Sequence, residues 1–169
     1  EFLKQSINRA RYFWRWDTPE KYQTNMRAYF RMISGIDHVV GRLVAQLEEQ
    51  CLADNTVIIY TADNGYYLGD RGFAGKWTHY EQSLRVPLIV HDPRLPDAKR
   101  GRVLKEMALN SDLASTMISL AGLPVPHAHT GRSLVPLLEG KTVADWRTDF
   151  LCEVLAVPGT IPRWEGVRD

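Results

Sequence analysis

The chain has 169 residues, of which 44% are hydrophobic and 24% are charged, and these values are close to those of globular domains. Its 21 basic and 20 acidic residues leave a formal net charge of +1, so the composition provides no general attraction to nucleic acid or to anionic lipid. No apolar run reaches the roughly 20 residues that a membrane helix needs. The composition therefore predicts a globular chain of about one domain without a membrane segment.

Residues 1–17 mix aromatic side chains with arginines and show no clear helical or strand period. Such a mixture also occurs in nucleic-acid-binding proteins, but the near-neutral charge favours a connecting segment that packs its rings onto the domain. The chain begins at Glu1 and has no signal-peptide pattern. We expect a processed chain or a piece of a longer protein, and periplasmic, extracellular and cytoplasmic locations all stay open.

A long helix is predicted from Thr18 to about Gln50. Thr18 can cap it, and Pro19 and Glu20 suit its first turn. Apolar residues then recur at steps of three and four, which predicts a stripe that faces the core. The stripe comprises Met26, Tyr29, Phe30, Ile33, Ile36, Val40, Leu43, Val44 and Leu47.

Four other residues are of types that can bind a metal ion or react as nucleophiles. Asp37 and His38 have no third ligand within reach along the helix, so a structural role is favoured. Cys51 and Cys152 lie far apart and form no metal-binding spacing. We expect two buried free thiols, and a disulfide between them stays open.

Two short apolar runs predict buried strands. Residues 56–61 are rich in β-branched side chains and carry no charge, which is typical of a parallel strand covered on both faces. Residues 86–90 predict a second strand, and Pro87 limits it to an edge or to a strand start. A short helix over residues 78–84 is expected between them.

Polar residues follow the first of these strands. Asp63 and Asn64 come directly after it, where open α/β sheets hold their ligands. Their oxygens suit Ca²⁺ or Mg²⁺, although Asp-Asn-Gly is also a common turn sequence. Lys76 follows at the end of a segment with four glycines, where the backbone can approach a ligand closely. The positive charge of Lys76 beside two residues that can bind a metal ion predicts a site for phosphate or sulfate esters.

The last third of the chain predicts one helix, followed by two short apolar elements. Asn110 is expected to cap a helix whose Leu113 and Met117 face inward, and Gly122 ends it. A short apolar segment at residues 133–138 and a strand within residues 146–154 follow, and the tail from Pro158 is expected to be irregular. His127 and His129 have no acidic or cysteine neighbour, which disfavours a metal site.

Several segments resemble the sulfatases of the alkaline phosphatase superfamily. Residues 61–90, TADNGYYLGDRGFAGKWTHYEQSLRVPLIV, resemble the carboxyl-terminal active-site segment of that family. Residues 29–54 resemble its preceding helix and turn, and residues 110–138, with LAGLP and GRSLVPLL, resemble its later helix and loop. The resemblance implies an α/β fold, namely the later part of a mixed, largely parallel sheet flanked by helices.

The resemblance also implies roles for individual residues. Asp63 and Asn64 would be two ligands of a calcium or magnesium ion. Lys76 would contact the sulfate ester near its leaving oxygen and is the expected catalytic residue of this chain. Many relatives have histidine where this chain has Tyr67 and Arg71, so a protonation role at these positions is in doubt. Five residues are candidates for the mouth of the substrate site around Lys76, with packing of the loop onto the core as the alternative: Tyr66, Tyr67, Arg71, Trp77 and His79.

The family's nucleophile is a formylglycine made from Cys or Ser in a Cys/Ser-x-Pro-x-Arg motif, and this motif is absent here. Cys51 is followed by Leu-Ala-Asp-Asn and Cys152 by Glu-Val-Leu-Ala. We therefore expect this chain to be the carboxyl-terminal portion of a sulfatase and to be inactive alone. The whole protein is expected to act on a sulfate-ester small molecule or a sulfated sugar. A phosphodiesterase or phosphonate monoester hydrolase of the same superfamily and a non-catalytic metal-binding module are the alternatives. An exposed sheet edge would favour self-association.

Overall fold

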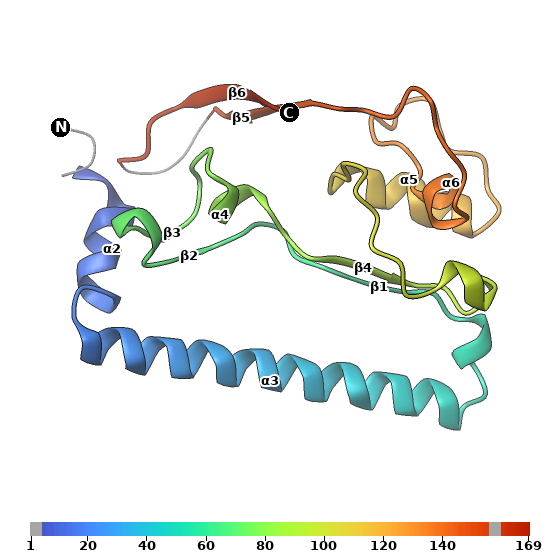
Figure 1. The fold of residues 1–169 in the computed structure, drawn as a ribbon, viewed down its shortest axis with the longest axis horizontal. Helices are drawn as coiled ribbons and strands as arrows, with labels where there is room; N and C mark the ends of the chain where they lie inside the picture. Colours follow the sequence, from blue (N-terminus) through green and yellow to red (C-terminus); the bar gives the residue numbers. More distant parts are fainter. Residues whose placement is uncertain (1–4, 156–159) are drawn as a thin grey trace. The chain divides into compact units, whose positions relative to one another are not determined.

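The structure is a computed structural model that describes residues 5–155 and 160–169. It forms two compact units, which are described separately: Glu1–Pro93 with Leu151–Gly166, and Arg94–Phe150 with Val167–Asp169. Figure 1 shows the elements. The helices are α2 (Ile7–Arg15), α3 (Pro19–Glu49), α4 (Glu81–Leu84), α5 (Ser111–Leu120) and α6 (Val135–Leu138). The strands are β1 (Ile58–Thr61), β2 (Tyr67–Leu68), β3 (Ala74–Gly75), β4 (Leu88–His91), β5 (Phe150–Val154) and β6 (Trp164–Arg168).

The predicted long helix is confirmed by α3. The Thr18 hydroxyl caps it by accepting a hydrogen bond from the amide of Lys21 at 3.3 Å, and Pro19 occupies the first turn. An amide nitrogen that would lack a partner at the helix start is thereby satisfied, and proline has no such nitrogen to satisfy. The capping signal in the sequence therefore sets where α3 begins.

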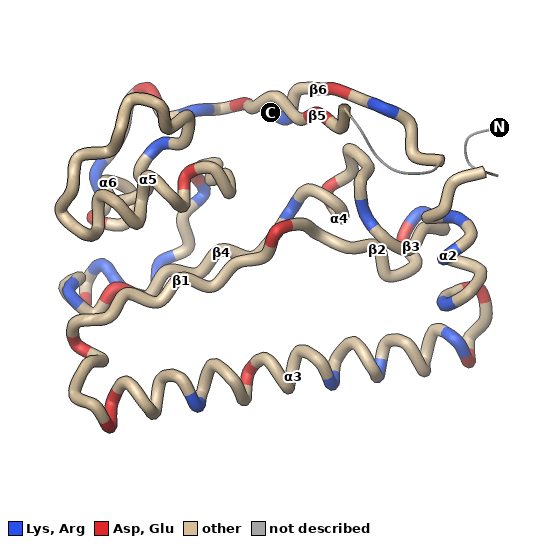
Figure 2. Tube along the Cα trace, turned by 180° about the vertical axis from the view of Figure 1, so that it is seen from behind, with Lys and Arg blue, Asp and Glu red and all other residues tan. Residues whose placement is uncertain are grey.

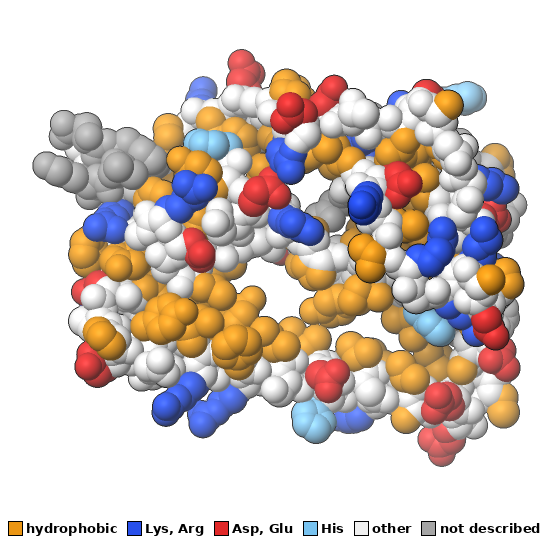
Figure 3. All heavy atoms as spheres, in the orientation of Figure 1, with side chains coloured by type: hydrophobic (Ala, Val, Ile, Leu, Met, Phe, Trp, Pro, Cys, Tyr) orange, Lys and Arg blue, Asp and Glu red, His pale blue; other side chains and the backbone are white. Residues whose placement is uncertain are grey.

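The expectation that the apolar stripe of α3 lies in a core is wrong for the described residues. No residue of α3 is buried, and Phe30 is 58% exposed and Leu43 55% exposed. Figure 3 shows hydrophobic side chains along the length of this helix. A stripe of this kind forms where a helix packs against a neighbour. The apolar residues of α3 therefore form a contact surface that the rest of the described chain does not cover.

The two predicted strands exist, but their pairing differs from the prediction. β1 and β4 are antiparallel, with Ile59 opposite Val90 and Thr61 opposite Leu88. Pro87 precedes β4, as its position at a strand start predicts. Ile89 is 60% exposed, so β4 is not covered on both faces within this part of the chain, and the parallel, fully buried strand expected at residues 56–61 is not found here.

The segment before α3 is a helix and not an irregular connection. The Ser6 hydroxyl accepts a hydrogen bond from the amide of Asn8 and so caps α2. The helix packs against β3, and Figure 1 shows the two side by side. Asn8 is completely buried and Trp16, just after the helix, is 7% exposed. The buried face of α2 is thus partly polar, which is why the hydrophobic period did not reveal it.

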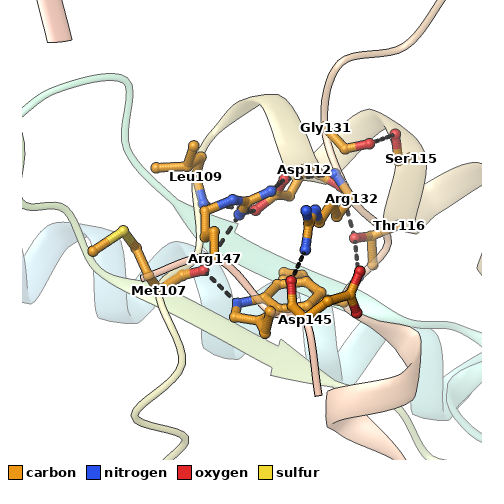
Figure 4. A network of polar contacts seen from close by, with 11 residues as sticks. Met107, Leu109, Asp112, Ser115, Thr116, Gly131, Arg132, Asp145 and Arg147 are labelled. Atoms are coloured by element: carbon orange, nitrogen blue, oxygen red, sulfur yellow. Dashed lines mark hydrogen bonds and ion pairs between the residues drawn. The ribbon is translucent and has the colours of Figure 1, made fainter. Parts of the chain in front are cut away.

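The second unit is organised by a buried carboxylate on α5. Asp112 is fully buried and accepts hydrogen bonds from the amides of Leu109 at 2.8 Å and Arg132 at 2.7 Å. The guanidinium of Arg147 completes the set with a two-pronged ion pair to the same carboxylate (Figure 4). Met117, which was expected to face inward, is 54% exposed. The inward face of α5 is therefore polar, because its partners are backbone groups of loops.

The remaining predictions for the carboxyl-terminal part were partly correct. β5 confirms a strand within residues 146–154, whereas the tail contains β6, which pairs with β5, and is not irregular throughout. Both cysteines are free, as expected; Cys152 is buried, but Cys51 is exposed. Among the residues that the structure describes, no helix combines the length and the apolar character needed to cross a membrane.

Candidate functional site

The polar residues after β1 are fixed by a close approach of two backbone segments. The amide of Gly65 donates a hydrogen bond to the carbonyl oxygen of Ser83 at 2.9 Å. A Cβ atom at position 65 would lie 2.2 Å from the carbonyl oxygen of Gln82 and 2.9 Å from that of Arg85. Only glycine fits this position without movement of the backbone, and the neighbouring Asp63 and Asn64 are thereby held next to α4.

Lys76 reaches these two residues. Its ammonium nitrogen donates a hydrogen bond to Asn64 Oδ1 at 2.5 Å and lies 3.8 Å from Asp63 Oδ2. The side chain of Lys76 is 32% exposed and that of Asp63 is 85% exposed, so one flank of the cluster is open to solvent. The structure therefore brings together the three residues that the sequence assigns to metal and ester binding.

The backbone that carries Lys76 is held by three side chains. The carboxamide of Asn8 donates to the Lys76 carbonyl oxygen at 2.7 Å. The amide of Trp77 donates to Ser83 Oγ at 2.9 Å, and the Trp77 carbonyl accepts from the indole of Trp164 at 2.9 Å. Trp77 has a φ of 77°, a left-handed conformation that is unfavourable for a bulky residue and persists where its surroundings enforce it.

Tyr67 lies beneath this loop and not at its surface. It is completely buried, its ring packs edge-on against Phe73 at 5.6 Å, and its hydroxyl shares a short hydrogen bond with the hydroxyl of Thr78. Burial raises the pKa of the Tyr67 phenol above its ordinary value. In this conformation Tyr67 cannot contact a substrate, so the expectation that it lines the site mouth is corrected to a packing role.

The other predicted substrate contacts lie among aromatic rings. The guanidinium carbon of Arg71 is 4.0 Å from the ring centroid of Tyr80, which is within the range of a cation–π contact. His79 packs against Tyr80 at 4.2 Å and against Trp164 at 5.7 Å between ring centroids. Arg71 and His79 are thus linked through Tyr80, a residue that the sequence did not single out.

A cavity of about 300 Å³ adjoins these rings. Trp77 and His79 both line it, while Asp63, Asn64 and Lys76 are not among its lining residues, so the expected place of Trp77 and His79 at the mouth of the substrate site stays a prediction. Residues of the carboxyl-terminal tail complete the wall, Trp164 among them. No local pattern signals this contribution, because the contact joins residues that lie 87 positions apart. The full lining is Phe73, Trp77, Thr78, His79, Tyr80, Ile161, Pro162 and Trp164.

Asp63 and Asn64 fit the role of cation ligands by their chemistry. They present a carboxylate and a carboxamide oxygen, the donors that Ca²⁺ and Mg²⁺ prefer. The ammonium group of Lys76 lies at both oxygens, which shows that they attract positive charge. Within residues 5–155 and 160–169, no group of three or more His, Cys, Asp or Glu side chains is arranged to hold a metal ion. The two residues can therefore supply only part of a coordination shell of six to eight oxygens.

Comparison with known proteins gives a consistent assignment. The family model described as Sulfatase matches residues 5–123. An N-acetylglucosamine-6-O-sulfatase of Bacteroides thetaiotaomicron is 42% identical over 152 residues, which are 88% of this chain and 27% of that protein. An arylsulfatase of Clostridium perfringens is 34% identical over 121 residues, or 71% of this chain and 25% of that protein. The chain thus spans about a quarter of the length of these relatives.

Solved structures agree with this result. A structure described as a complex with its substrate D-glucosamine-2-N,6-O-disulfate superimposes with a TM-score of 0.81 at 38% identity, covering 88% of this chain and 30% of that one. A phosphonate monoester hydrolase from Silicibacter pomeroyi gives a TM-score of 0.75 at 36% identity over 81% of this chain and 26% of its own. The α/β fold is that of the alkaline phosphatase superfamily, and the chain belongs to the sulfatase family.

Proposed function

We propose that the protein containing this chain hydrolyses a sulfate ester, and that this chain supplies one part of the active site. The observation that carries the proposal is the contact of the Lys76 ammonium with Asn64 and Asp63. It places a positive group and two oxygen donors in one cluster with an open flank. Such a cluster can bind a divalent cation and an anionic ester side by side.

Asp63 and Asn64 would each offer an oxygen to a calcium or magnesium ion. Sulfatases as a family use a divalent metal and a formylglycine, and a metal ion at such a site polarises the ester oxygens. Lys76 would move its ammonium group from Asn64 to the sulfate oxygens and stabilise the negative charge that develops as the ester bond breaks. The formylglycine motif is not in this chain, so the nucleophile has to come from elsewhere in the protein.

A sulfated sugar is the substrate class that we favour. The solved structure with a TM-score of 0.81 is a complex of a relative with its substrate, a disulfated glucosamine. In this chain, Trp77 and His79 line a cavity with further aromatic residues, and aromatic faces combine an apolar surface with polar edges, as sugars do. Arg71, which stacks on Tyr80, would offer a second positive group to an anionic substituent.

The test measures hydrolysis of an aryl sulfate by the full-length protein. Lys76→Ala is expected to lower kcat roughly 100-fold or more, the size of effect seen when one charge-stabilising donor is removed. Lys105→Ala is the matched control, because Lys105 is an exposed lysine of the other unit. Equal rates for Lys76→Ala and Lys105→Ala would overturn the role of Lys76. These 169 residues alone should show no turnover, and metal-dependent turnover by them would contradict the division of the site.

The similarity to a phosphonate monoester hydrolase supports a second candidate function, the hydrolysis of a phosphodiester or a phosphonate monoester. A pair of metal-binding residues and a lysine would serve a phosphoryl group equally well. The two candidates are separated by comparing kcat/KM for an aryl sulfate with kcat/KM for an aryl phosphonate. A higher value for the phosphonate ester favours the second. No turnover of either ester by the full-length protein favours a non-catalytic metal-binding module.

A further inference from the structure

We propose that Asn8 is a positioning residue that sets the place of the Lys76 ammonium group, an inference that rests on the role of Lys76 proposed above. Asn8 does not reach the ammonium group itself. It holds the backbone carbonyl of Lys76, 68 positions away, through a hydrogen bond of 2.7 Å. The buried polar face of α2 would then serve to position Lys76, a role that the residues around Lys76 in the sequence do not indicate.

The burial of Asn8 is the first step of the argument. The side chain is completely buried, and a buried carboxamide is costly unless it is hydrogen-bonded. Its nitrogen has the Lys76 carbonyl as partner, but its oxygen, Oδ1, has none among the described residues. An apolar residue of the same shape at position 8 would leave the Lys76 carbonyl oxygen without this donor. The direction of the single Asn8 hydrogen bond is therefore the feature to explain.

The close packing of Asn8 on the loop is the second step. Gly75 has a φ of 120°, and a Cβ atom there would lie 2.4 Å from Asn8 Oδ1. Any other residue at position 75 would push the carboxamide away from Lys76. Position 75 and position 8 thus depend on each other, and together they define where the chain passes before Lys76.

A second contact from α2 supports the same loop. Arg9 donates from Nη1 to the carbonyl oxygen of Gly72 at 2.9 Å. Asn8 and Arg9 therefore hold carbonyl groups on both sides of β3, before Ala74 and after Gly75. Figure 2 shows the basic positions along α2 next to β3. Two anchors on one rigid helix fix both the position and the direction of the strand between them.

The strained residue after Lys76 completes the argument. Trp77 adopts a left-handed φ of 77°, so without its partners the Lys76–Trp77 peptide would relax to a more common conformation. Such a rotation would redirect the Lys76 side chain and separate its ammonium from Asn64 Oδ1, which now lies at 2.5 Å. Asn8 prevents this from the Lys76 side of the peptide.

The experiment reads the position of the ammonium group through the side-chain carboxamide signal of Asn64 in NMR spectra of this chain. Lys76→Ala should shift that signal. Asn8→Asp keeps the shape of the side chain but removes the donor, and it should shift the signal in the same direction by at least half as much. Asn25→Asp is the matched control, since Asn25 also donates from a helix to backbone carbonyls, those of Arg15 and Lys21. It should leave the Asn64 signal in place.

The outcomes separate this inference from the proposed function. An Asn64 signal that stays in place in folded Asn8→Asp, or in Lys76→Ala, overturns the positioning role. If circular dichroism shows that Asn8→Asp is unfolded, Asn8→Ala is read by the same criterion. In the full-length protein, Asn8→Asp should lower kcat for an aryl sulfate at least tenfold with little change in KM, and Asn8→Gln should restore part of the loss. Unchanged hydrolysis by Lys76→Ala refutes the proposed function, whereas unchanged hydrolysis by Asn8→Asp alone refutes only the inference.

Discussion

The ammonium nitrogen of Lys76 and the carboxamide oxygen of Asn64 are hydrogen-bonded at 2.5 Å across twelve positions of the chain. An oxygen that accepts a hydrogen bond from an ammonium group has less electron density to donate to a metal ion. Lys76 and a divalent cation would therefore compete for Asn64 unless a bound ester draws the lysine away. Under the proposed function, this one contact would couple metal binding to ester binding.

We predict that Lys76→Met raises the Ca²⁺ affinity of this chain. The substitution removes a positive charge 3.8 Å from Asp63 Oδ2 and frees Asn64 Oδ1, and the partial exposure of both groups limits the gain to about tenfold, or roughly 1.4 kcal/mol. Isothermal titration calorimetry measures the effect. Lys105→Met serves as the control, and an affinity that is equal in both variants would show that Lys76 and the ion do not compete.

Tyr67 predicts how stability depends on high pH. Its pKa is raised in the folded state by burial, so the folded protein retains the phenolic proton where the unfolded chain, with an ordinary pKa of about 10, releases it. Stability is therefore fully present below pH 10 and falls as the pH rises toward the folded pKa. Tyr67→Phe should remove this part of the decline.

The same substitution has a cost at neutral pH. It deprives the Thr78 hydroxyl of its partner, and Thr78 is 7% exposed, so a loss of about 1–3 kcal/mol is expected. Urea unfolding at pH 7 and at several values above 10 measures both effects. Parallel pH profiles for Tyr67→Phe and the unchanged chain would contradict the assignment to Tyr67.

Asp112→Ala should destabilise the second unit strongly. The substitution leaves the Arg147 guanidinium, whose side chain is 12% exposed, without its carboxylate, and two backbone amides also lose their acceptor. Removal of one partner of a buried pair costs about 3–5 kcal/mol. Urea unfolding followed by tryptophan fluorescence is suitable, because Trp146 lies beside Arg147. Asp145→Ala is the control: its carbonyl oxygen accepts from Arg132, and this contact survives the substitution.

The sequence was informative where local rules decide the structure. The Thr18 cap, the end of α3 near Gln50 and the position of Pro87 before β4 were predicted because they depend on a few neighbouring residues. The association of Asp63, Asn64 and Lys76 followed from a family resemblance and from the glycines between them. The contacts confirm that these three residues meet, whereas their binding roles stay predictions.

The sequence was misleading where distant contacts decide. The hydrophobic pattern of α3 predicts a face buried in the core, although none of its residues is buried by the described chain. The polar faces of α2 and α5 were missed, because Asn8 and Asp112 are buried by hydrogen bonds to backbone groups that lie 68 and 20 positions away. Polar burial of this kind has no period for a pattern to detect. The wall of the cavity formed by Trp164 was missed for the same reason.

Two glycines offer a matched pair of tests. Gly65→Ala should cost about 1–3 kcal/mol, since the added Cβ would lie 2.2 Å from a backbone oxygen. Gly41→Ala, in the middle of α3 with nothing within 4 Å of the added carbon, should stabilise the chain by about 0.5–1 kcal/mol. Thermal unfolding by circular dichroism compares them. A neutral effect of Gly65→Ala would show that α4 moves freely away from residue 65.

The exposed stripe of α3 leads to a prediction of self-association. Phe30 and Ile33 are 58% and 44% exposed on this helix, and apolar surface of this extent favours contact between copies. Size-exclusion chromatography with light scattering should give a mass above the 19.3 kDa of one chain. Phe30→Glu should lower that mass, and Gln23→Glu, which adds the same charge at an exposed polar position of α3, should not. A monomer for the unchanged chain would contradict the prediction.

The bond between Asn8 and Lys76 has a consequence for the order in which the chain folds. The two residues are 68 positions apart, so a long loop must close before the carbonyl of Lys76 finds its donor, and contacts of this range form slowly. The helix α3 between them can form early from its own residues. A nascent chain would therefore complete its longest helix first and acquire the geometry around Lys76 late, when the segment that follows α3 has returned to α2.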